Sequence, residues 1–442
     1  MQCYFYTFGC KVNTCETAGM QHLLRSCGYG ITDTPAAADI AVINSCTVTA
    51  SGDHRMLTFL RQLRKKNPAL VIVLTGCYVQ AFPEEAGRIE EADIIIGNKD
   101  KERLPELIQH FLEKPSYVHG IFSVSPYEQS DSFVQLPCDT FAHNTRAFLK
   151  IQDGCNCFCS YCIIPYARGR CRSMPMENLK EAAAQLTKNG YREIVLCGIN
   201  LAFYGKEWDG SLLDAVQCAA DAGTERVRLG SLEPERMTDE LLHGLSELPA
   251  FCPQFHLSLQ SGCSRTLHAM NRRYTAEEYA AFCEKIRRYF PDCAITTDIM
   301  VGFPGETEED FQTSLAFAES IGFAKMHVFR YSPRPGTPAA RMKDQIPENV
   351  KTERMHKMQT CAARMQRAYL KSCIGRTVPV LFERERGDGF HTGHAPDGTV
   401  IKIPQKNRKK SLRKSIFYVR IEESDDACCY GQLTEDCHAN PT

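Results

Sequence analysis

The chain has 442 residues, and its 52 Lys and Arg nearly balance its 53 Asp and Glu, for a formal net charge of -1 at pH 7. Hydrophobic residues make up 43% and charged residues 24% of the sequence, a globular composition that excludes disordered and collagen-like chains. Because the net charge is close to zero, any nucleic-acid binding must come from a local basic patch.

Cysteine usage indicates a reducing environment. The sequence contains 23 Cys, yet it is long enough to bury a core without disulfides. Its first residues lack the pattern of a secretory signal, and no apolar run approaches the ~20 residues of a transmembrane helix. We therefore expect a cytoplasmic protein whose clustered Cys are metal ligands or catalytic groups.

Residues 1–115 alternate short apolar strands with helical stretches. β-branched runs at 41–46 and 71–77 each end in a Cys, and apolar residues at helical spacing lie between them at 55–66. This alternation predicts a parallel sheet covered by helices, in which ligands bind beyond the carboxyl ends of the strands. Three thiols are therefore expected at one sheet edge: Cys10, Cys46 and Cys77.

Three further regions follow along the chain. Residues 116–140 are rich in Ser, Asp and Pro and are predicted to be a linker. Residues 141–369 hold six strand-like runs separated by amphipathic helical segments, which predicts a (β/α)6-type partial barrel with its chemistry at the carboxyl ends of the strands. Residues 370–437 are short strands separated by Gly and Asp turns and predict a small β-barrel. The predicted fold class is α/β.

The densest Cys group follows the first strand of the predicted partial barrel. The segment 154–162 reads G-C-N-C-F-C-S-Y-C. A zinc ribbon needs a second, distant pair of ligands, and the pair Cys428–Cys429 is too closely spaced to supply it. An iron–sulfur cluster suits closely spaced thiolates on a turning loop better, although four buried or disulfide-paired Cys remain a structural alternative. Three ligands, Cys155, Cys159 and Cys162, would leave one iron open to bind a small molecule.

This loop resembles the signature of the radical S-adenosylmethionine (SAM) superfamily. The resemblance implies a [4Fe-4S] cluster on those three Cys, with SAM on the open iron. It also implies reductive cleavage of SAM to a 5′-deoxyadenosyl radical that abstracts a hydrogen atom. Cys157 departs from the usual pattern and is expected to be an idle thiol.

The whole chain resembles the methylthiotransferase branch of that superfamily. The motifs that carry the resemblance lie at 7–17, 42–49, 75–80, 152–170, 259–263, 270–274 and 298–307. The resemblance implies a second [4Fe-4S] cluster on Cys10, Cys46 and Cys77, whose open iron carries the sulfur or methylsulfide to be inserted. Three buried core Cys are the structural alternative. Cys3 and Cys15 are expected to be bystanders, and we assign no role to Cys171.

The expected reaction modifies tRNA. G-C-K-V-N at 9–13 resembles the MtaB type, which methylthiolates carbon 2 of N6-threonylcarbamoyladenosine at tRNA position 37. The resemblance implies one SAM as radical source, another as methyl donor, and sulfur delivered through the second cluster. Isopentenyladenosine in tRNA or a ribosomal protein side chain is the alternative substrate. A non-catalytic RNA-binding protein and a single-cluster methyltransferase are rival interpretations. Expected partners are tRNA and a flavodoxin- or ferredoxin-like electron donor, and a monomer is favoured.

Candidate SAM contacts lie in the Cys loop and at the ends of the predicted barrel strands. Tyr161 has an aromatic face that suits adenine. For each candidate the alternative is a helix cap, a turn or an ion pair. The full set is Tyr161, Gly198, Asn200, Glu233, Ser258, Gln260, Asp298 and Arg330. The run 302–307 lacks the ending of a phosphate loop and is predicted to be a strand-to-helix turn capped by Thr307.

A basic segment marks the expected RNA contact. The window 402–414 carries seven basic residues and no acidic one: Lys402, Lys406, Arg408, Lys409, Lys410, Arg413 and Lys414. A charge run is often only a solvated face, but by resemblance this barrel is an RNA-binding TRAM domain. A second basic stretch, Arg61, Arg64, Lys65 and Lys66, either extends the footprint or is the exposed face of its helix. The target adenine is expected to be flipped out of its loop.

Overall fold

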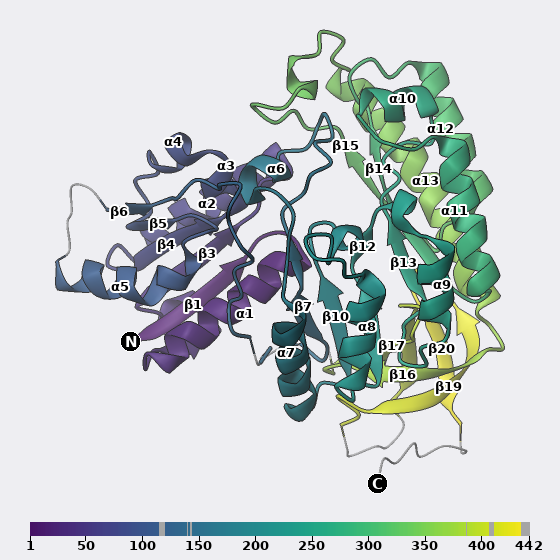
Figure 1. Ribbon diagram of the computed structural model, residues 1–442, viewed down its shortest axis with the longest axis horizontal. Coiled ribbons are helices and arrows are strands. Elements are labelled where there is room, and N and C mark those ends of the chain that lie inside the picture. The colour runs from purple at the N-terminus through teal and green to yellow at the C-terminus, as the bar shows by residue number, and fades with distance from the viewer. Residues whose placement is uncertain (115–119, 139, 142–143, 386, 406–410, 435–442) are drawn as a thin grey trace.

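A six-stranded, all-parallel sheet forms the N-terminal part of the protein (Figure 1). The computed structural model describes residues 1–114, 120–138, 140–141, 144–385, 387–405 and 411–434. In sheet order the strands are β2 (Gly30–Thr32), β1 (Gln2–Thr7), β3 (Ile40–Ser45), β4 (Val71–Gly76), β5 (Ile94–Ile96) and β6 (Ile121–Ser123). β3 is buried at every residue, as expected for a β-branched strand covered on both faces. β6 lies in the segment predicted to be a linker and pairs with β5 through only three residues.

Helices cover both faces of this sheet. They are α1 (Lys11–Ser26), α2 (Ala50–Lys66), α3 (Cys77–Ala81), α4 (Pro83–Ala86) and α5 (Leu104–Glu113). Met56, Leu60 and Leu63 of α2 pack on one face, while Met20 and Leu24 of α1 pack on the other. The predicted parallel sheet with helical cover is therefore confirmed.

The central part is a partial barrel of parallel strands in two adjoining sheets. The first contains β11 (Arg226–Leu229), β10 (Glu193–Cys197) and β7 (Ala147–Lys150). The second contains β12 (Ser231–Leu232), β13 (Gln254–Leu257), β14 (Ala294–Val301) and β15 (Lys325–Arg330). A short antiparallel pair, β8 (Gln152–Asp153) with β9 (Arg172–Ser173), lies beside β7.

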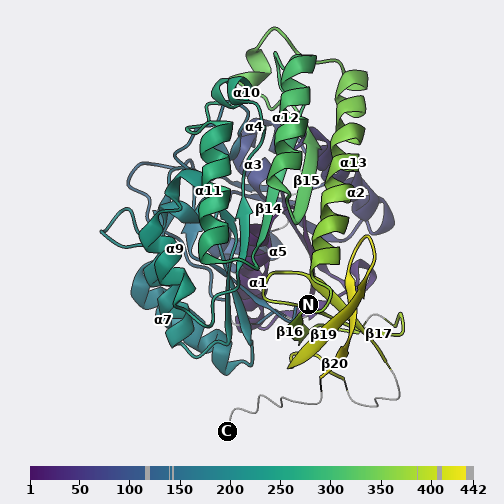
Figure 2. The ribbon, with the colours of Figure 1, turned by 90° about the vertical axis from the view of Figure 1, so that its right-hand side faces the viewer.

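Helices surround the outside of the partial barrel (Figure 2). They are α7 (Met176–Lys188), α8 (Leu212–Asp221), α9 (Asp239–Ser246), α10 (Ser264–Ala269), α11 (Ala276–Tyr289), α12 (Glu308–Ile321) and α13 (Glu348–Ser372). The short helix α6 (Ile164–Arg168) lies instead against α3 of the N-terminal part. Thr307 caps α12 in a capping box with Asp310, which confirms the turn predicted at 302–307. One continuous hydrophobic core joins these helices to the strands.

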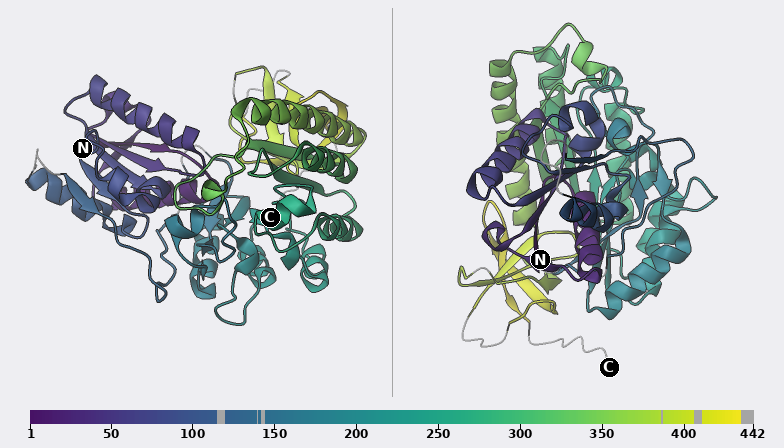
Figure 3. Two further views of the ribbon diagram at one scale, coloured as in Figure 1. Left: turned by 90° about the horizontal axis from the view of Figure 1, so that it is seen from above. Right: turned by 90° about the vertical axis from the view of Figure 1, so that its left-hand side faces the viewer.

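The C-terminal strands close into a five-stranded barrel, as predicted. Its order is β16 (Thr377–Phe382), β17 (Phe390–His394), β18 (Val400–Pro404), β20 (Cys429–Leu433) and β19 (Ile416–Ser424). Seen from above, the N-terminal sheet and this barrel lie on different sides of the central part (Figure 3). Arg226 and Arg228 of β11 join the central part to the barrel by donating to the carbonyl oxygens of His394 and Pro396 at 3.0 and 2.8 Å.

None of the described helices combines the length and the apolar character needed to cross a membrane.

Candidate functional site

The Cys loop of the central part is closed at its base by the β8–β9 pair. Gly154 begins the loop with a left-handed φ of 72°, and a Cβ there would lie 1.9 Å from the Arg170 carbonyl oxygen. The Cys155 amide donates to the Gly169 carbonyl oxygen at 3.1 Å. The loop is thereby folded back on itself, with three of its thiols forming what we call the loop triad: Cys155, Cys159 and Cys162.

Each thiol of the loop triad has its own surroundings. The Cys157 amide and the Asn200 Nδ2 donate to Cys155 Sγ at 3.4 and 3.9 Å. A hydrogen bond from the Cys157 thiol lowers the pKa of Cys155 to about 7. Arg272 Nη1 donates to Cys159 Sγ at 3.3 Å. These donors favour the thiolate, the form in which Cys binds a metal. Burial outweighs Arg272 at Cys159 and raises the pKa of that thiol, and burial raises the pKa of Cys162 to about 12.

The N-terminal triad consists of Cys10, Cys46 and Cys77. Cys10 precedes α1, while Cys46 and Cys77 directly follow the paired strands β3 and β4. A Cβ on Gly9, whose φ is 104°, would lie 2.9 Å from Cys46 Sγ. Burial, with a smaller effect of the nearby Cys77 thiol, raises the pKa of Cys46 to about 12. The three thiols thus share one edge of the sheet, and the absent side chain at Gly9 leaves room beside them.

The donor sets of both triads fit iron–sulfur clusters better than single metal ions. Among the described residues, no three His, Cys, Asp or Glu side chains gather closely enough to hold one metal ion. A tetrahedral zinc site needs such close approach, with Zn–S distances of about 2.3 Å. If only the three Cys of a triad bind, one iron of a [4Fe-4S] cluster stays open. Cys157, whose thiol hydrogen-bonds to Cys155, is a fourth thiol in the Cys loop.

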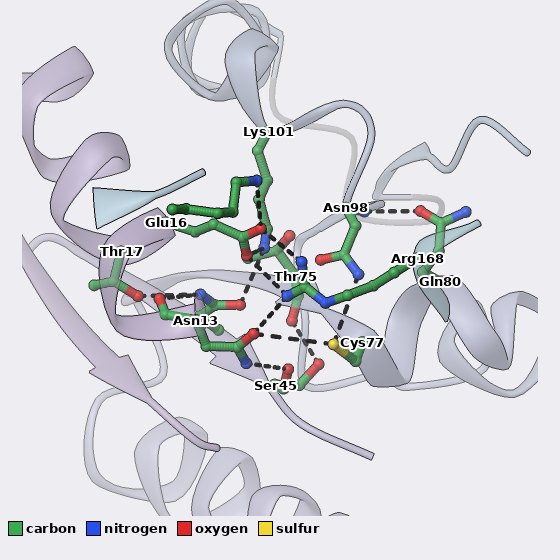
Figure 4. A network of polar contacts seen from close by, with 12 residues as sticks. Asn13, Glu16, Thr17, Ser45, Thr75, Cys77, Gln80, Asn98, Lys101 and Arg168 are labelled. Carbon is green, nitrogen blue, oxygen red and sulfur yellow. Dashed lines mark hydrogen bonds and ion pairs between the residues drawn. The ribbon is translucent and has the colours of Figure 1, made fainter. Parts of the chain in front are cut away.

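The two triads are joined through a buried interface. α3, which begins at Cys77, packs against α6, which follows the Cys loop (Figure 1). Beside this contact lies a buried ionic network that spans both parts of the chain (Figure 4). Its members are Glu16, Lys101, Lys150, Asp153 and Arg168. We call it the interface network.

Glu16 and Arg168 are the central pair of the interface network. Arg168 Nη1 donates to Glu16 Oε1 at 2.8 Å, and Lys101 and Lys150 bind the same carboxylate at 2.5 and 3.1 Å. Burial alone would raise the pKa of Glu16, but these three cations outweigh it and hold the pKa well below its usual range. The network therefore keeps its charges although it is buried.

A cavity lies between the N-terminal part and the partial barrel. It is bordered by a thiol of the loop triad and by residues that follow a thiol of the N-terminal triad. Its volume is about 180 Å³, and its lining includes Val48 and Thr49, just after Cys46, together with Cys162 itself. The Ala50 amide donates to Ser332 Oγ at 3.1 Å at this border. Four predicted SAM contacts also line it: Tyr161, Gln260, Asp298 and Arg330. We call it the interdomain cavity.

The other four predicted SAM contacts lie outside the lining of this cavity. Asn200 donates to the thiols of Cys155 and Cys157, and Glu233 binds Arg272. The carbonyl oxygen of Ser258 accepts from Arg272 at 3.0 Å, and Gly198 packs against Gln152. Asn200 and Glu233 thus surround the loop triad, while Gly198 and Ser258 contribute main chain to the strand ends.

Three further Cys were singled out in the sequence: Cys3, Cys15 and Cys171. Cys3 is buried in β1, and Cys15 is buried in α1. The Cys171 thiol donates to the Gly154 carbonyl oxygen at 3.8 Å, at the base of the loop.

The predicted RNA-binding residues lie on the barrel and on the segment beyond β18. Lys402 pairs with Asp388 at 3.0 Å, and Lys414 lies over the Tyr191 ring at 4.4 Å. Arg413 and Lys414 border a surface pocket with Tyr191. Lys406, Arg408, Lys409 and Lys410 lie outside the described residues.

In the second basic stretch, one residue makes structural hydrogen bonds and the other three are exposed. Arg64 Nη1 and Nη2 donate to the carbonyl oxygens of Leu70 and Glu91 at 2.8 and 2.9 Å and hold the ends of neighbouring elements together. Arg61, Lys65 and Lys66 are exposed.

Sequence reasoning missed the polar residues around both triads. Three of them lie inside the motifs at 152–170, 270–274 and 7–17, namely Arg168, Arg272 and Asn13. Their place in a motif was the only sequence signal for a role at the site. Asn98 donates to Cys77 Sγ at 3.8 Å and lies in no motif that was identified.

Two family models match the chain. Residues 149–318 match the Radical SAM superfamily, and residues 2–97 match the Uncharacterized protein family UPF0004.

Curated relatives are similar over most of the chain. The Threonylcarbamoyladenosine tRNA methylthiotransferase MtaB of Bacillus subtilis (strain 168) is 39% identical, with 86% of this chain and 84% of the relative covered. The enzyme of the same name from Thermotoga maritima is 37% identical, with 97% of both chains covered. The tRNA-2-methylthio-N(6)-dimethylallyladenosine synthase of Wolbachia pipientis wMel is 34% identical, covering 97% of this chain and 98% of the relative.

Solved structures share the fold at low sequence identity. The radical SAM methyltransferase TsrM of Kitasatospora setae, with tryptophan and a SAM analogue bound, has a TM-score of 0.55 at 16% identity and covers 77% of this chain and 75% of its own. The cobalamin-dependent radical SAM enzyme OxsB with aqua-cobalamin has a TM-score of 0.51 at 11% identity, covering 81% of this chain and 56% of its own.

Proposed function

The chain belongs to the radical SAM methylthiotransferase family, and on that premise we propose that it methylthiolates carbon 2 of N6-threonylcarbamoyladenosine at position 37 of tRNA. Family members use [4Fe-4S] clusters and SAM and transfer methylthio groups, and the curated relatives above are named for tRNA substrates. The MtaB relatives at 37 and 39% identity support the threonylcarbamoyl substrate over the other adenosine types.

The interdomain cavity is the observation that carries this proposal. It borders Cys162 of the loop triad and the residues that follow Cys46 of the N-terminal triad. A base held there would lie between the two cysteine sets, as a reaction that both removes a hydrogen atom and adds sulfur requires. Phe329 is 45% exposed, lines the same cavity and offers a flat face to a flipped-out base.

The reaction replaces the C2–H bond by a C–S bond, and the sulfur carries a methyl group. When bound, SAM and the clusters supply the hydrogen-abstracting radical, the sulfur and the methyl group. The side chains of the protein position the base and exclude water. Tyr161, Gln260 and Asp298 line the same cavity as Cys162 and are assigned to SAM binding.

The basic segment around Lys414 is assigned to the phosphates of the anticodon stem and loop. We propose that a flavodoxin- or ferredoxin-like protein supplies the electrons and that the reaction takes place in the cytoplasm. We propose that the chain acts as a monomer.

The test uses anaerobically reconstituted protein with SAM, a reductant and three tRNAs: one carrying threonylcarbamoyladenosine, one carrying isopentenyladenosine and one unmodified. Nucleoside mass spectrometry is expected to detect the methylthio product only with the first. Deuterium placed at C2 of the target base is expected to appear in 5′-deoxyadenosine. Product with isopentenyladenosine alone would assign the chain to the activity named for its Wolbachia relative.

A matched pair of variants tests the cavity. Phe329→Ala is expected to lower kcat/KM by about tenfold or more, because stacking on one base contributes about 1–3 kcal/mol. Phe122→Ala removes a similarly exposed Phe from β6, outside the lining of the cavity, and is expected to leave kcat/KM unchanged. Equal activity of both variants would place the base elsewhere.

A further inference from the structure

Arg168 is a fully buried residue of the central part that reaches into the N-terminal part (Figure 4). It ends α6, and its guanidinium donates to Glu16 and Asn13 of α1 at 2.8 and 2.7 Å and to Asp153 at 3.1 Å. Burial of a guanidinium is costly unless its charge and its N–H groups find partners. The two carboxylates supply part of that compensation.

The same side chain is linked to Cys77 of the N-terminal triad through two amides. Asn13 Oδ1 accepts from Arg168 Nη2 at 2.7 Å and from the Cys77 thiol at 3.9 Å. Asn98 Nδ2 donates to Cys77 Sγ at 3.8 Å and to the carbonyl oxygen of Ala167, the neighbour of Arg168, at 3.0 Å. Residues from both parts of the chain therefore surround one thiol.

Several buried polar atoms in this region have no hydrogen-bond partner among the described residues. They are Arg168 Nε, Asn98 Oδ1 and Thr75 Oγ1, on residues that are each at least nine-tenths buried. Unpaired buried polar groups are rare in proteins, and an unseen water or ion is one explanation for them. The Arg168 Nε–H is a donor that an anionic group beside Cys77 would satisfy.

The charge balance of the interface network points the same way. Four buried cations, Lys101, Lys150, Arg168 and Arg172, pair with two anions, Glu16 and Asp153, which leaves positive charge in excess. Three iron-bound thiolates outweigh the charge of an oxidised [4Fe-4S] core, so a cluster on the N-terminal triad would carry the balancing negative charge.

We propose that Arg168 is a tuning residue for the cluster of the N-terminal triad: with Asn98, it stabilises the thiolate charge there and raises the cluster's reduction potential. The inference rests on the second cluster of the proposed function. Hydrogen bonds to cluster sulfurs and nearby charge set such potentials. Because Arg168 belongs to the central part, the potential of this cluster depends on the docking of the two parts.

The test measures the N-terminal cluster alone. In a Cys155→Ala/Cys159→Ala/Cys162→Ala background, the reconstituted protein is titrated by potentiometry and followed by electron paramagnetic resonance. Arg168→Met is expected to shift the midpoint potential to more negative values and to speed iron loss to a chelator. Arg168→Lys keeps the charge and is expected to give a smaller shift.

Lys150→Met is the matched control, because it removes a buried cation from the same carboxylates but has no contact with the amides beside Cys77. It is expected to lower the midpoint of chemical unfolding and to shift the potential by less than Arg168→Met does, because it removes a charge of the network but no hydrogen bond to the amides beside Cys77. If Arg168→Met does not fold, Arg168→Lys and Asn98→Ala decide, since each is expected to shift the potential negatively.

Three outcomes would overturn the inference. An unshifted potential in the Arg168 and Asn98 variants would leave Arg168 as a purely structural ion pair. An equal shift in Lys150→Met would assign the effect to the whole network. A background variant that holds no iron would remove the second cluster itself and, with it, that part of the proposed function.

Discussion

Arg272 joins Cys159 to Glu233 across the mouth of the partial barrel. Its Nη1 donates to the Cys159 sulfur at 3.3 Å and to Glu233 Oε1 at 3.3 Å, while its Nη2 donates to the Ser258 carbonyl oxygen at 3.0 Å. The Arg272 side chain is 3% exposed. One side chain therefore orients a predicted cluster ligand and a predicted SAM contact at the same time.

Replacing Arg272 by Met is expected to lower SAM cleavage by about 10–100-fold, the usual cost of removing a group that orients a metal ligand. The measurement is 5′-deoxyadenosine formed per chain under reducing conditions, together with iron content. Arg273→Met, at the exposed neighbouring position, is the control and is expected to behave as wild type. Unchanged cleavage in Arg272→Met would show that Cys159 needs no such support.

A comparison of Gly9 with Gly28 distinguishes the effect of backbone strain from the effect of a steric clash beside the N-terminal triad. Both have left-handed φ values, 104° and 84°, but a Cβ would meet Cys46 Cβ at 2.7 Å only at Gly9, whereas Gly28 has nothing within 4 Å. Gly9→Ala is expected to lose about four of about eight iron atoms per reconstituted chain. Gly28→Ala carries the strain alone and is expected to keep the full complement at a lower stability. Full iron loading of Gly9→Ala would contradict a cluster beside Cys46.

The positions of the Cys residues could be predicted because strand patterns report burial. β3 and β4 are buried strands rich in β-branched residues, and a thiol directly after each must lie at the edge where parallel strands end. The polar partners could not be predicted in the same way. Arg168 and Glu16 are 152 residues apart in sequence, and nothing local records which carboxylate a buried guanidinium will reach.

The linker prediction and the basic stretch on α2 also show that a tertiary partner cannot be predicted from local sequence. β6 is a strand only because β5 lies beside it, and three residues carry too little pattern to be recognised. Arg64 looked like one charge of a basic face, yet its hydrogen bonds to carbonyl oxygens make it a structural residue. In each case the tertiary partner decides the role.

Glu193 gives the protein a predicted sensitivity to acid. It is buried, and although burial opposes its charge, Arg228 at 2.7 Å holds its pKa at about 2. Because this folded-state pKa lies below the ordinary value of about 4.3, the stabilisation is complete above that value and is lost as the pH falls toward 2. Wild type should therefore lose stability between about pH 4 and pH 2.

Glu193→Gln is expected to remove that part of the acid sensitivity and to cost about 3 kcal/mol at pH 7, because it leaves Arg228 without its buried partner. Urea unfolding at pH 7 and pH 3.5 measures both effects. Glu225→Gln breaks a more exposed ion pair with Arg192 and should cost less than about 1 kcal/mol at either pH. Equal destabilisation in the two variants would contradict the role of Glu193.

Positive charge on the C-terminal barrel is expected to set the salt dependence of tRNA binding. Substitution of four residues between β18 and β19 by Ala, namely Lys406, Arg408, Lys409 and Lys410, removes charge next to Arg413 and Lys414, which lie beside Tyr191. The slope of log affinity against log salt should fall by about 0.7 for each phosphate of a single-stranded loop that the variant no longer neutralises.

The control replaces Arg61, Lys65 and Lys66, three exposed charges on α2, and should leave the slope unchanged if the barrel alone holds the RNA. A fall in the slope with the α2 variant and none with the barrel variant would move the RNA footprint to the N-terminal part, and the TRAM-like assignment of the barrel would then be wrong.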